Sequence, residues 1–215
     1  MSKTLNNDVQ LLIRKAEPSD WPAIRDICCK TGNSGEAIAA DRWSFFSEQW
    51  VGPYQKLLPE WTYVAAQSSH VCAYLTGCPD TALLKKRKLF FDLQLALKIA
   101  SKRFPPNADT KRFLKRTFRL DDWPEARFSE SAWKTILSSY PAHLHINADA
   151  EFRGKGTGRA LIDRFSADLR KRTIPGIHVF CGIKPVPFYE RLGFQEIEKI
   201  EFVPGVWVYA LGLAL

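Results

Sequence analysis

Residues 143–169 read HLHINADAEFRGKGTGRALIDRFSADL, and this stretch decides the fold. Its first five residues alternate in the manner of a strand, and a glycine-rich turn follows at residues 153–158. Three apolar residues then recur four positions apart, as on one face of a helix: Leu161, Phe165 and Leu169. An apolar strand is predicted next, at residues 177–181. Strand, glycine turn, helix and strand together predict a crossover unit.

Segments on both sides extend this unit into an α/β chain with a mixed sheet. Further strands are predicted at residues 13–16, 62–66, 70–75 and 206–211. Ile24, Ile27 and Cys28 have helical spacing, and a short helix is predicted at residues 188–192. A chain of 215 residues with 46% hydrophobic content is long enough to bury a sizeable core. We therefore expect one domain over residues 1–215.

A helical, basic insertion is predicted at about residues 82–138, between the third and fourth strands. Residues 85–119 carry twelve Lys or Arg against two Asp, whereas the whole chain has a net charge of +8. Such a segment can attract an anionic partner, but most are solvated helix faces. Residues 89–100 are apolar on nearly every side, which predicts a helix buried on more than one face or packed on a partner.

Composition gives broad expectations about location and metal binding. The first residues, MSKTLNND, are polar, and no apolar run approaches the roughly 20 residues that span a bilayer. We therefore expect a soluble, membrane-independent protein of the cytoplasm, with the nucleus left open. The five cysteines form no Cys-x-x-Cys pair, so reduced core thiols and no metal site are expected.

The turn at residues 153–158, RGKGTG, has the chemistry of an anion site. Glycines let backbone amides approach a ligand closely, and a helix N-terminus presents unsatisfied amides with the positive end of its dipole. The turn lacks the Gly-Lys-Ser or Gly-Lys-Thr ending of a Walker loop. Its glycines, at 154, 156 and 158, also miss the Rossmann spacing. A pyrophosphate suits such a site.

Two motifs in order carry a resemblance to a known family. Arg-x-x-Gly-x-Gly at residues 153–158, after a strand and before a helix, resembles the acetyl-CoA signature of the GNAT superfamily. FYERLGF at residues 188–194 is similar to the second signature of that superfamily. Residues 140–146 and 77–81 also resemble GNAT proteins related to the acetyltransferase-like C-terminal domain of O-GlcNAcase. The resemblance implies a GNAT fold, with a central mixed sheet of about seven strands flanked by helices.

The resemblance also implies roles for individual residues. Three positions on the fourth strand would offer backbone groups to the pantetheine arm of acetyl-CoA: Ile146, Asn147 and Ala148. Seven positions of the turn would hold its pyrophosphate: Arg153, Gly154, Lys155, Gly156, Thr157, Gly158 and Arg159. Tyr189 falls where many members place a tyrosine that protonates the departing thiolate. A phenol of pKa ~10 can serve as proton donor to a thiolate whose conjugate acid has a pKa of ~8.5.

The general base is less clear from the sequence. Asp80, His145 or an ordered water chain could take the proton of an amine acceptor. Asn147 stands where close relatives tend to have aspartate, and an amide cannot accept a proton as a carboxylate does. His143 and His145 lie two residues apart on one strand, but no further ligand accompanies them at metal-binding spacing. The catalytic residues expected are therefore Tyr189 and Asp80.

Three functions remain open at this point. The first is direct acetyl transfer from acetyl-CoA to a small-molecule or peptide amine. The second is an inactive acetyl-CoA-binding protein of the same fold. The third is nucleic-acid binding through residues 85–119, which predicts a steep dependence of affinity on salt. The acceptor's identity and a homodimeric state are also left open.

Overall fold

The computed structural model describes residues 11–68, 70–118 and 127–215. They contain a seven-stranded sheet in the order β1-β2-β3-β4-β5-β7-β6. The strands are β1 (Leu11–Lys15), β2 (Thr62–Gln67), β3 (His70–Cys78), β4 (Ala142–Ala148), β5 (Gly176–Gly182), β6 (Gln195–Val203) and β7 (Val206–Ala214). Only β4 and β5 pair in parallel, and the other pairs are antiparallel. This confirms the predicted mixed sheet of about seven strands.

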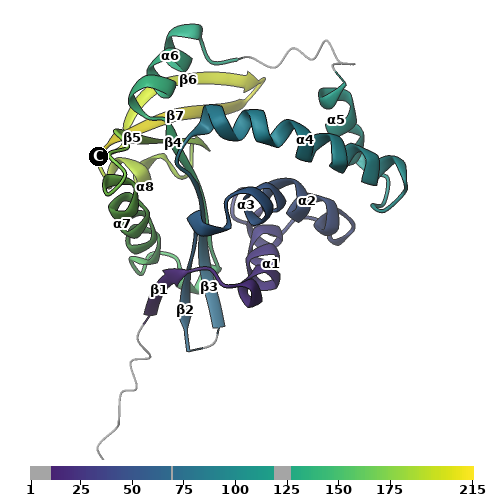
Figure 1. The fold of residues 1–215 in the computed structure, drawn as a ribbon, viewed down its shortest axis with the longest axis horizontal. Coiled ribbons are helices and arrows are strands. Elements are labelled where there is room, and N and C mark those ends of the chain that lie inside the picture. The colour runs from purple at the N-terminus through teal and green to yellow at the C-terminus, as the bar shows by residue number, and fades with distance from the viewer. Residues whose placement is uncertain (1–10, 69, 119–126) are drawn as a thin grey trace, which may run out of the picture.

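Helices cover both faces of the sheet (Figure 1). One face carries α1 (Trp21–Thr31), α2 (Trp43–Trp50) and α3 (Gly52–Leu57), and the other carries α7 (Thr157–Arg170) with α8 (Val186–Glu190). Short 3-10 turns complete the chain: η1 (Pro18–Asp20), η2 (Ala40–Arg42), η3 (Pro59–Trp61) and η4 (Ala150–Phe152). Because strand side chains alternate, Tyr63 and Leu75 join the α7 core, whereas Val64 and Tyr74 pack with α1.

The insertion between β3 and β4 is helical, as predicted. It contains α4 (Thr81–Ala100), α5 (Ala108–Thr117) and α6 (Glu130–Ser139). Phe91 and Leu95 of α4 form a separate core with Phe45 of α2 and Phe113 of α5. Five large apolar residues of α4 are exposed: Leu83, Leu89, Phe90, Leu93 and Leu97. One apolar face of this helix is therefore buried, while a second remains at the surface of the described structure.

Strand β6 was not among the individually predicted strands. It is an edge strand that pairs only with β7, its register shifts twice, and most of its residues are polar. Edge strands often carry charges and bulges, and these remove the clean alternation that reveals a half-buried strand. The β6–β7 hairpin closes the sheet at this edge.

Three predictions concern the limits of the chain and its cysteines. The polar residues 1–8 and Arg119 of the basic segment lie outside the described residues. None of the helices described has both the length and the apolar character that crossing a membrane requires. All five cysteines are free and four of them are buried, in agreement with the expected core thiols.

Candidate functional site

The sheet opens between β4 and β5. Their pairing consists of Ala142 with Ile177 and His143 with His178. Beyond these pairs β4 continues to Ala148, still paired with β3, and no longer contacts β5 in register. Ile146, Asn147 and Ala148 therefore lie on the diverging part of the strand, where the resemblance placed them. A strand edge without a neighbouring strand leaves backbone groups available to a ligand.

A tight turn follows β4 and leads into α7. Gly154 and Gly156 have φ of 73° and 81°, in the left-handed region that favours glycine. A Cβ built at either position would meet no atom within 4 Å, so backbone conformation and not crowding explains these two glycines. The turn is thus exposed on the side where a side chain would otherwise stand.

The start of α7 supplies unsatisfied donors beside this turn. The first intrahelical bond runs from the amide of Ala160 to the carbonyl of Gly156, at 3.0 Å. The amides of Thr157, Gly158 and Arg159 precede it, as the free amides of any helix start do. The helix has 14 residues, so its dipole adds positive potential at this end. These amides, next to a glycine turn, fit a pyrophosphate.

Gly158 has a different role from its two neighbours. A Cβ at this position would lie 2.9 Å from Cζ of Phe188 and 3.7 Å from Cδ1 of Ile146. The absence of a side chain therefore allows α7 to approach α8 and β4 closely. A larger residue at 158 would therefore displace Phe188, whether or not a phosphate is bound.

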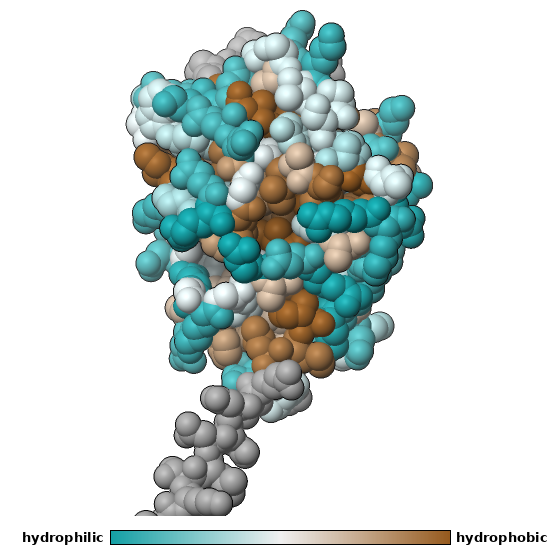
Figure 2. Space-filling model, turned by 90° about the vertical axis from the view of Figure 1, so that its left-hand side faces the viewer, coloured by the Kyte–Doolittle hydropathy of each residue, from teal (hydrophilic) through white to brown (hydrophobic). Residues whose placement is uncertain are grey.

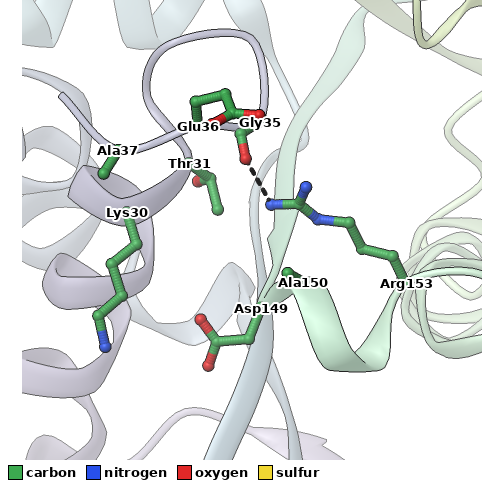
Figure 3. Close-up of a pocket in the computed structure, with 8 residues that line it drawn as sticks. All are labelled: Lys30, Thr31, Gly35, Glu36, Ala37, Asp149, Ala150 and Arg153. Carbon is green, nitrogen blue, oxygen red and sulfur yellow. Dashed lines mark hydrogen bonds between the residues drawn. The ribbon is translucent and has the colours of Figure 1, made fainter.

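Two long side chains of the turn, those of Arg153 and Arg159, bind backbone carbonyls of the protein. Arg153 donates from Nε to the Ala148 carbonyl at 3.0 Å. It also donates from Nη2 to the Gly35 carbonyl at 2.8 Å (Figure 3). Arg159 donates to the carbonyl of Arg191 at 3.1 Å. Both arginine side chains thus brace the surroundings of the turn, whereas Nζ of Lys155 lies 5.5 Å from the centroid of the Phe152 ring.

The two faces of β4 differ in chemistry. Ile146 points toward α7 and packs against the main core. Figure 2 shows hydrophobic surface gathered near the centre of the side of the molecule on which α7 lies. On the opposite face, the Asn147 amide donates to the Tyr74 hydroxyl at 2.9 Å. His145 lies between Tyr74, whose hydroxyl is 3.5 Å from Nδ1, and Trp50, which stacks on its ring. Burial lowers the pKa of His145 to about 4, so this histidine is neutral at pH 7.

The sequence did not reveal the partners of His143. Its Nδ1 is 2.6 Å from the Thr81 hydroxyl and its Nε2 is 2.9 Å from the Tyr54 hydroxyl. Burial, followed by the nearby His178, lowers the pKa of His143 to about 3. The alternation of HLH in the sequence indicated that the histidines share a face, but these partners lie in distant segments. Among the residues described, no group of three or more side chains suits a metal ion.

Tyr189 is buried on the α7 side of the sheet. Its side chain packs between Phe188 and Phe194, and only 7% of the residue is exposed. Burial raises the pKa of its phenol, with a smaller contribution from Cys181. The hydroxyl makes no hydrogen bond to another described residue, so its proton is available to a ligand that reaches it.

Asp80 lies at the other end of β4 from the glycine turn. Its carboxylate accepts the amide of Leu83 at 2.9 Å and caps α4. The next residue, Thr81, is bonded to the carbonyl of Pro141, which precedes β4. Asn147 follows Pro141 by six residues, which corresponds to a distance of roughly 20 Å along a strand. The structure therefore does not bring Asp80 to the turn, and a helix cap accounts for this aspartate.

A pocket of about 300 Å³ adjoins the end of β4 on the α1 side (Figure 3). It lies between the end of α1, the following loop and the β4–α7 segment. Its lining includes Lys30, Gly35, Glu36, Asp149 and Arg153. The Arg153 guanidinium forms one wall, where it reaches across to Gly35. The pocket thus joins the glycine turn to a loop that is distant in sequence.

A family model described as an acetyltransferase (GNAT) domain matches residues 137–211, from the end of α6 through most of β7. This part of the chain, which includes β4, the glycine turn and α7, is therefore similar to the GNAT acetyltransferases. The crystal structure of SsHAT is 28% identical, with a TM-score of 0.71 over 95% of this chain and 98% of that one. Because 95% of this chain is covered, this match extends well beyond residues 137–211.

More distant relatives match parts of the chain or its fold. The fold of a putative acetyltransferase from Salmonella typhimurium, solved with its cofactor acetyl-CoA, matches with a TM-score of 0.55 over 95% of this chain and 94% of that one, at 16% identity. An uncharacterized N-acetyltransferase of Methanocaldococcus jannaschii is 36% identical over 64 residues, which is 28% of either chain. A GCN5-related N-acetyltransferase of Arabidopsis thaliana is 36% identical over 50 residues, which is 23% of this chain and 19% of that one. These two relatives therefore align over less than a third of their own lengths.

Proposed function

We propose that this protein is an acetyl-CoA-dependent N-acetyltransferase that acts on a small-molecule or peptide amine. One observation carries the proposal: the free amides at the start of α7 and the exposed glycine turn directly follow the diverging part of β4. This arrangement supports an anion site at the end of an open strand edge. A ligand with a pyrophosphate and a long amide-containing arm matches both parts.

The chain's own residues would hold the cosubstrate through backbone groups. The amides of residues 154–159 would bind the pyrophosphate, and the edge of β4 at residues 146–148 would bind the pantetheine arm. Acetyl-CoA supplies an activated acetyl thioester when bound. The carbonyl of Ala148 already accepts a hydrogen bond from Arg153, so the remaining backbone groups of this edge would serve the arm.

Tyr189 would hold the proton needed by a leaving group. Its raised pKa keeps the phenol protonated at neutral pH, and its hydroxyl has no partner among the described residues. It lies on the same face as α7 and α8, where the pyrophosphate site is. Donation from its Oη to a sulfur that gains charge would lower the barrier to release.

The proton of the acceptor amine requires a second group. His145 is neutral and lies on β4 just beyond the point where β5 diverges, so its position suits this role better than that of Asp80. A carboxylate that caps a helix at the far end of the strand would need a chain of water molecules to act there. We therefore propose that His145, directly or through water, relays the proton of the acceptor and does not hold it, since a pKa of about 4 makes this imidazole a weak base.

Cofactor binding tests this proposal directly. A ligand that binds only the native turn should stabilise the folded protein by about 2.7 kcal/mol at a hundredfold excess over its dissociation constant. Thermal unfolding with acetyl-CoA would show this, and thiol release with a panel of amines would then show transfer. No shift at millimolar acetyl-CoA would remove the proposal. Binding without transfer to any amine would instead indicate an inactive acetyl-CoA-binding protein.

A further inference from the structure

Arg153 connects two parts of the chain that are 118 residues apart in sequence. Arg153 is the first residue of the glycine turn, but its guanidinium points away from the turn and contacts the loop after α1 (Figure 3). Nη2 donates to the Gly35 carbonyl at 2.8 Å, and Nε donates to the Ala148 carbonyl at 3.0 Å. One side chain therefore fixes the end of β4 and the loop at the same time.

The loop is shaped around this arginine. Gly35 has a φ of 97°, and a Cβ there would lie 3.2 Å from Nη1 of Arg153. The loop is also closed on itself, since the amide of Gly35 donates to Thr31 and the amide of Glu36 donates to Asn33, both at 3.0 Å. The backbone conformation thus favours glycine at this position, and a Cβ would push the guanidinium away by a few tenths of an ångström.

The same contact forms a wall of the pocket at the end of β4. Arg153 and Gly35 stand on one side of it, and Lys30 and Asp149 stand on others. Movement of the loop away from β4 would open this wall. The pocket's shape therefore depends on where Arg153 holds the loop.

We propose that Arg153 is a positioning residue that couples the cofactor turn to the pocket. This inference rests on the proposed function. An anion bound by the turn amides would immobilise the backbone at residues 153–158. The hydrogen bonds of the Arg153 side chain would then also reduce the motion of residues 32–39. The bound cofactor would then stabilise the pocket wall, and by reciprocity a ligand in the pocket would strengthen cofactor binding. Arg153 acts through the loop, because two of its three nitrogens are already committed to carbonyls away from the turn amides.

Hydrogen exchange of the loop amides measures this coupling without any acceptor. Acetyl-CoA should slow exchange at residues 32–39 of the wild-type protein by roughly tenfold, the scale of one hydrogen bond to a charged donor. Arg153→Met should abolish that slowing while the dissociation constant of acetyl-CoA changes by less than about threefold. Arg153→Lys, which keeps the charge but can reach only one carbonyl, should retain part of it.

Arg25→Met is the matched control, because Arg25 also makes several long-range hydrogen bonds, to Gln55 and Glu48, away from the turn. In Arg25→Met, acetyl-CoA should still slow hydrogen exchange at residues 32–39, even if the melting temperature of this variant falls. A wild type that does not bind acetyl-CoA overturns the proposed function. Binding that leaves exchange of the loop unchanged, or protection that persists in Arg153→Met, overturns this inference alone. A loss of affinity beyond about thirtyfold in a folded Arg153→Met would make Arg153 a cofactor ligand and also overturn it.

Discussion

Two side chains on opposite faces of the sheet, Tyr189 and His145, are kept neutral by the same cause. Burial penalises the charged form of each group, so the pKa of the phenol rises and that of the imidazole falls. One therefore keeps a proton at pH 7 and the other keeps a free lone pair. A proton donor on the cofactor side and an acceptor on the other are what direct transfer to an amine requires.

Replacing Tyr189 by phenylalanine tests the donor. The hydroxyl has no hydrogen-bond partner in the described structure. Tyr189→Phe therefore removes only the hydrogen bond or proton that the hydroxyl would donate to the departing thiolate. We expect the turnover rate to fall by roughly 10²-fold, the low end for a lost general acid, with little change in acetyl-CoA affinity. Thiol release with one accepted amine measures the rate.

Tyr63→Phe is the control for loss of a buried phenol. The Tyr63 hydroxyl donates to Asp168 at 3.1 Å, in the core behind α7. Its loss should cost about 1.5–3 kcal/mol of stability, as for a hydrogen bond to a charged group, and leave the rate per folded molecule unchanged. If Tyr189→Phe instead behaves like Tyr63→Phe, Tyr189 is a packing residue.

At the scale of single residues, the sequence predicted backbone roles better than side-chain roles. The glycines of residues 153–158 indicate a conformation, and that conformation is local, so the turn was predictable. The target of the Arg153 side chain was not, because Gly35 lies 118 residues away. Asp80 shows the same difficulty, since a carboxylate before a helix can cap it or act chemically, and only packing decides between the two.

The two faces of helix α4 should contribute very differently to the free energy of unfolding. Phe91 is 4% exposed in the cluster with Phe45 and Leu95, whereas its neighbour Phe90 is 68% exposed. Phe91→Ala should lower the free energy of unfolding by about 3–5 kcal/mol, because it leaves a cavity. Phe90→Ala should change it by less than about 0.5 kcal/mol. Denaturant unfolding measures both, and equal effects would mean that the exposed face of α4 is covered in solution.

The turn before α7 offers a second matched pair. Gly156 and Gly205 have φ of 81° and 78°, and a Cβ at either would meet nothing within 4 Å. Alanine at each position should cost about 1–2 kcal/mol for the left-handed backbone. Only Gly156→Ala should also reduce stabilisation by acetyl-CoA, because Gly205 lies in the β6–β7 turn. Thermal unfolding with and without acetyl-CoA separates the two effects, and equal cofactor shifts would place the pyrophosphate elsewhere.

At the scale of elements, periodicity predicted the helices and the inner strands. Buried strands such as β5 read as apolar runs, and α7 repeats its apolar residues every turn. Periodicity did not reveal β6, whose polar sequence resembles a loop, nor how far β4 pairs with β5. Strand divergence depends on which residues of two distant segments meet, and a single sequence does not contain that information.

The whole molecule should be sensitive to mild acid. Burial lowers the pKa of His143 to about 3 and those of His145 and His178 to about 4, below the ~6.5 of an unfolded histidine. The unfolded chain therefore binds more protons than the folded one between these values. The stability that neutral histidines provide is complete above pH 6.5 and is lost as the pH falls toward 4.

We expect each histidine to contribute a loss of up to about 1.4 kcal/mol per pH unit in this window. His145→Gln should remove about one third of the slope in a plot of unfolding free energy against pH from 6.5 to 4.5. Denaturant unfolding in a series of buffers gives this slope. Stability that stays constant over the window would show that the folded and unfolded chains bind protons equally, so that burial does not lower these pKa values.

The narrow junction between β4 and β5 also bears on how the chain folds. Two residue pairs are the only described strand pairing between residues 11–148 and residues 176–215. The β2–β3 and β6–β7 hairpins form from near neighbours, whereas the junction must wait for the crossover through α7 to close. Contacts made after the transition state govern how fast a protein unfolds rather than how fast it folds. A molecule bound across the junction would therefore lengthen the lifetime of the folded chain without hastening its formation.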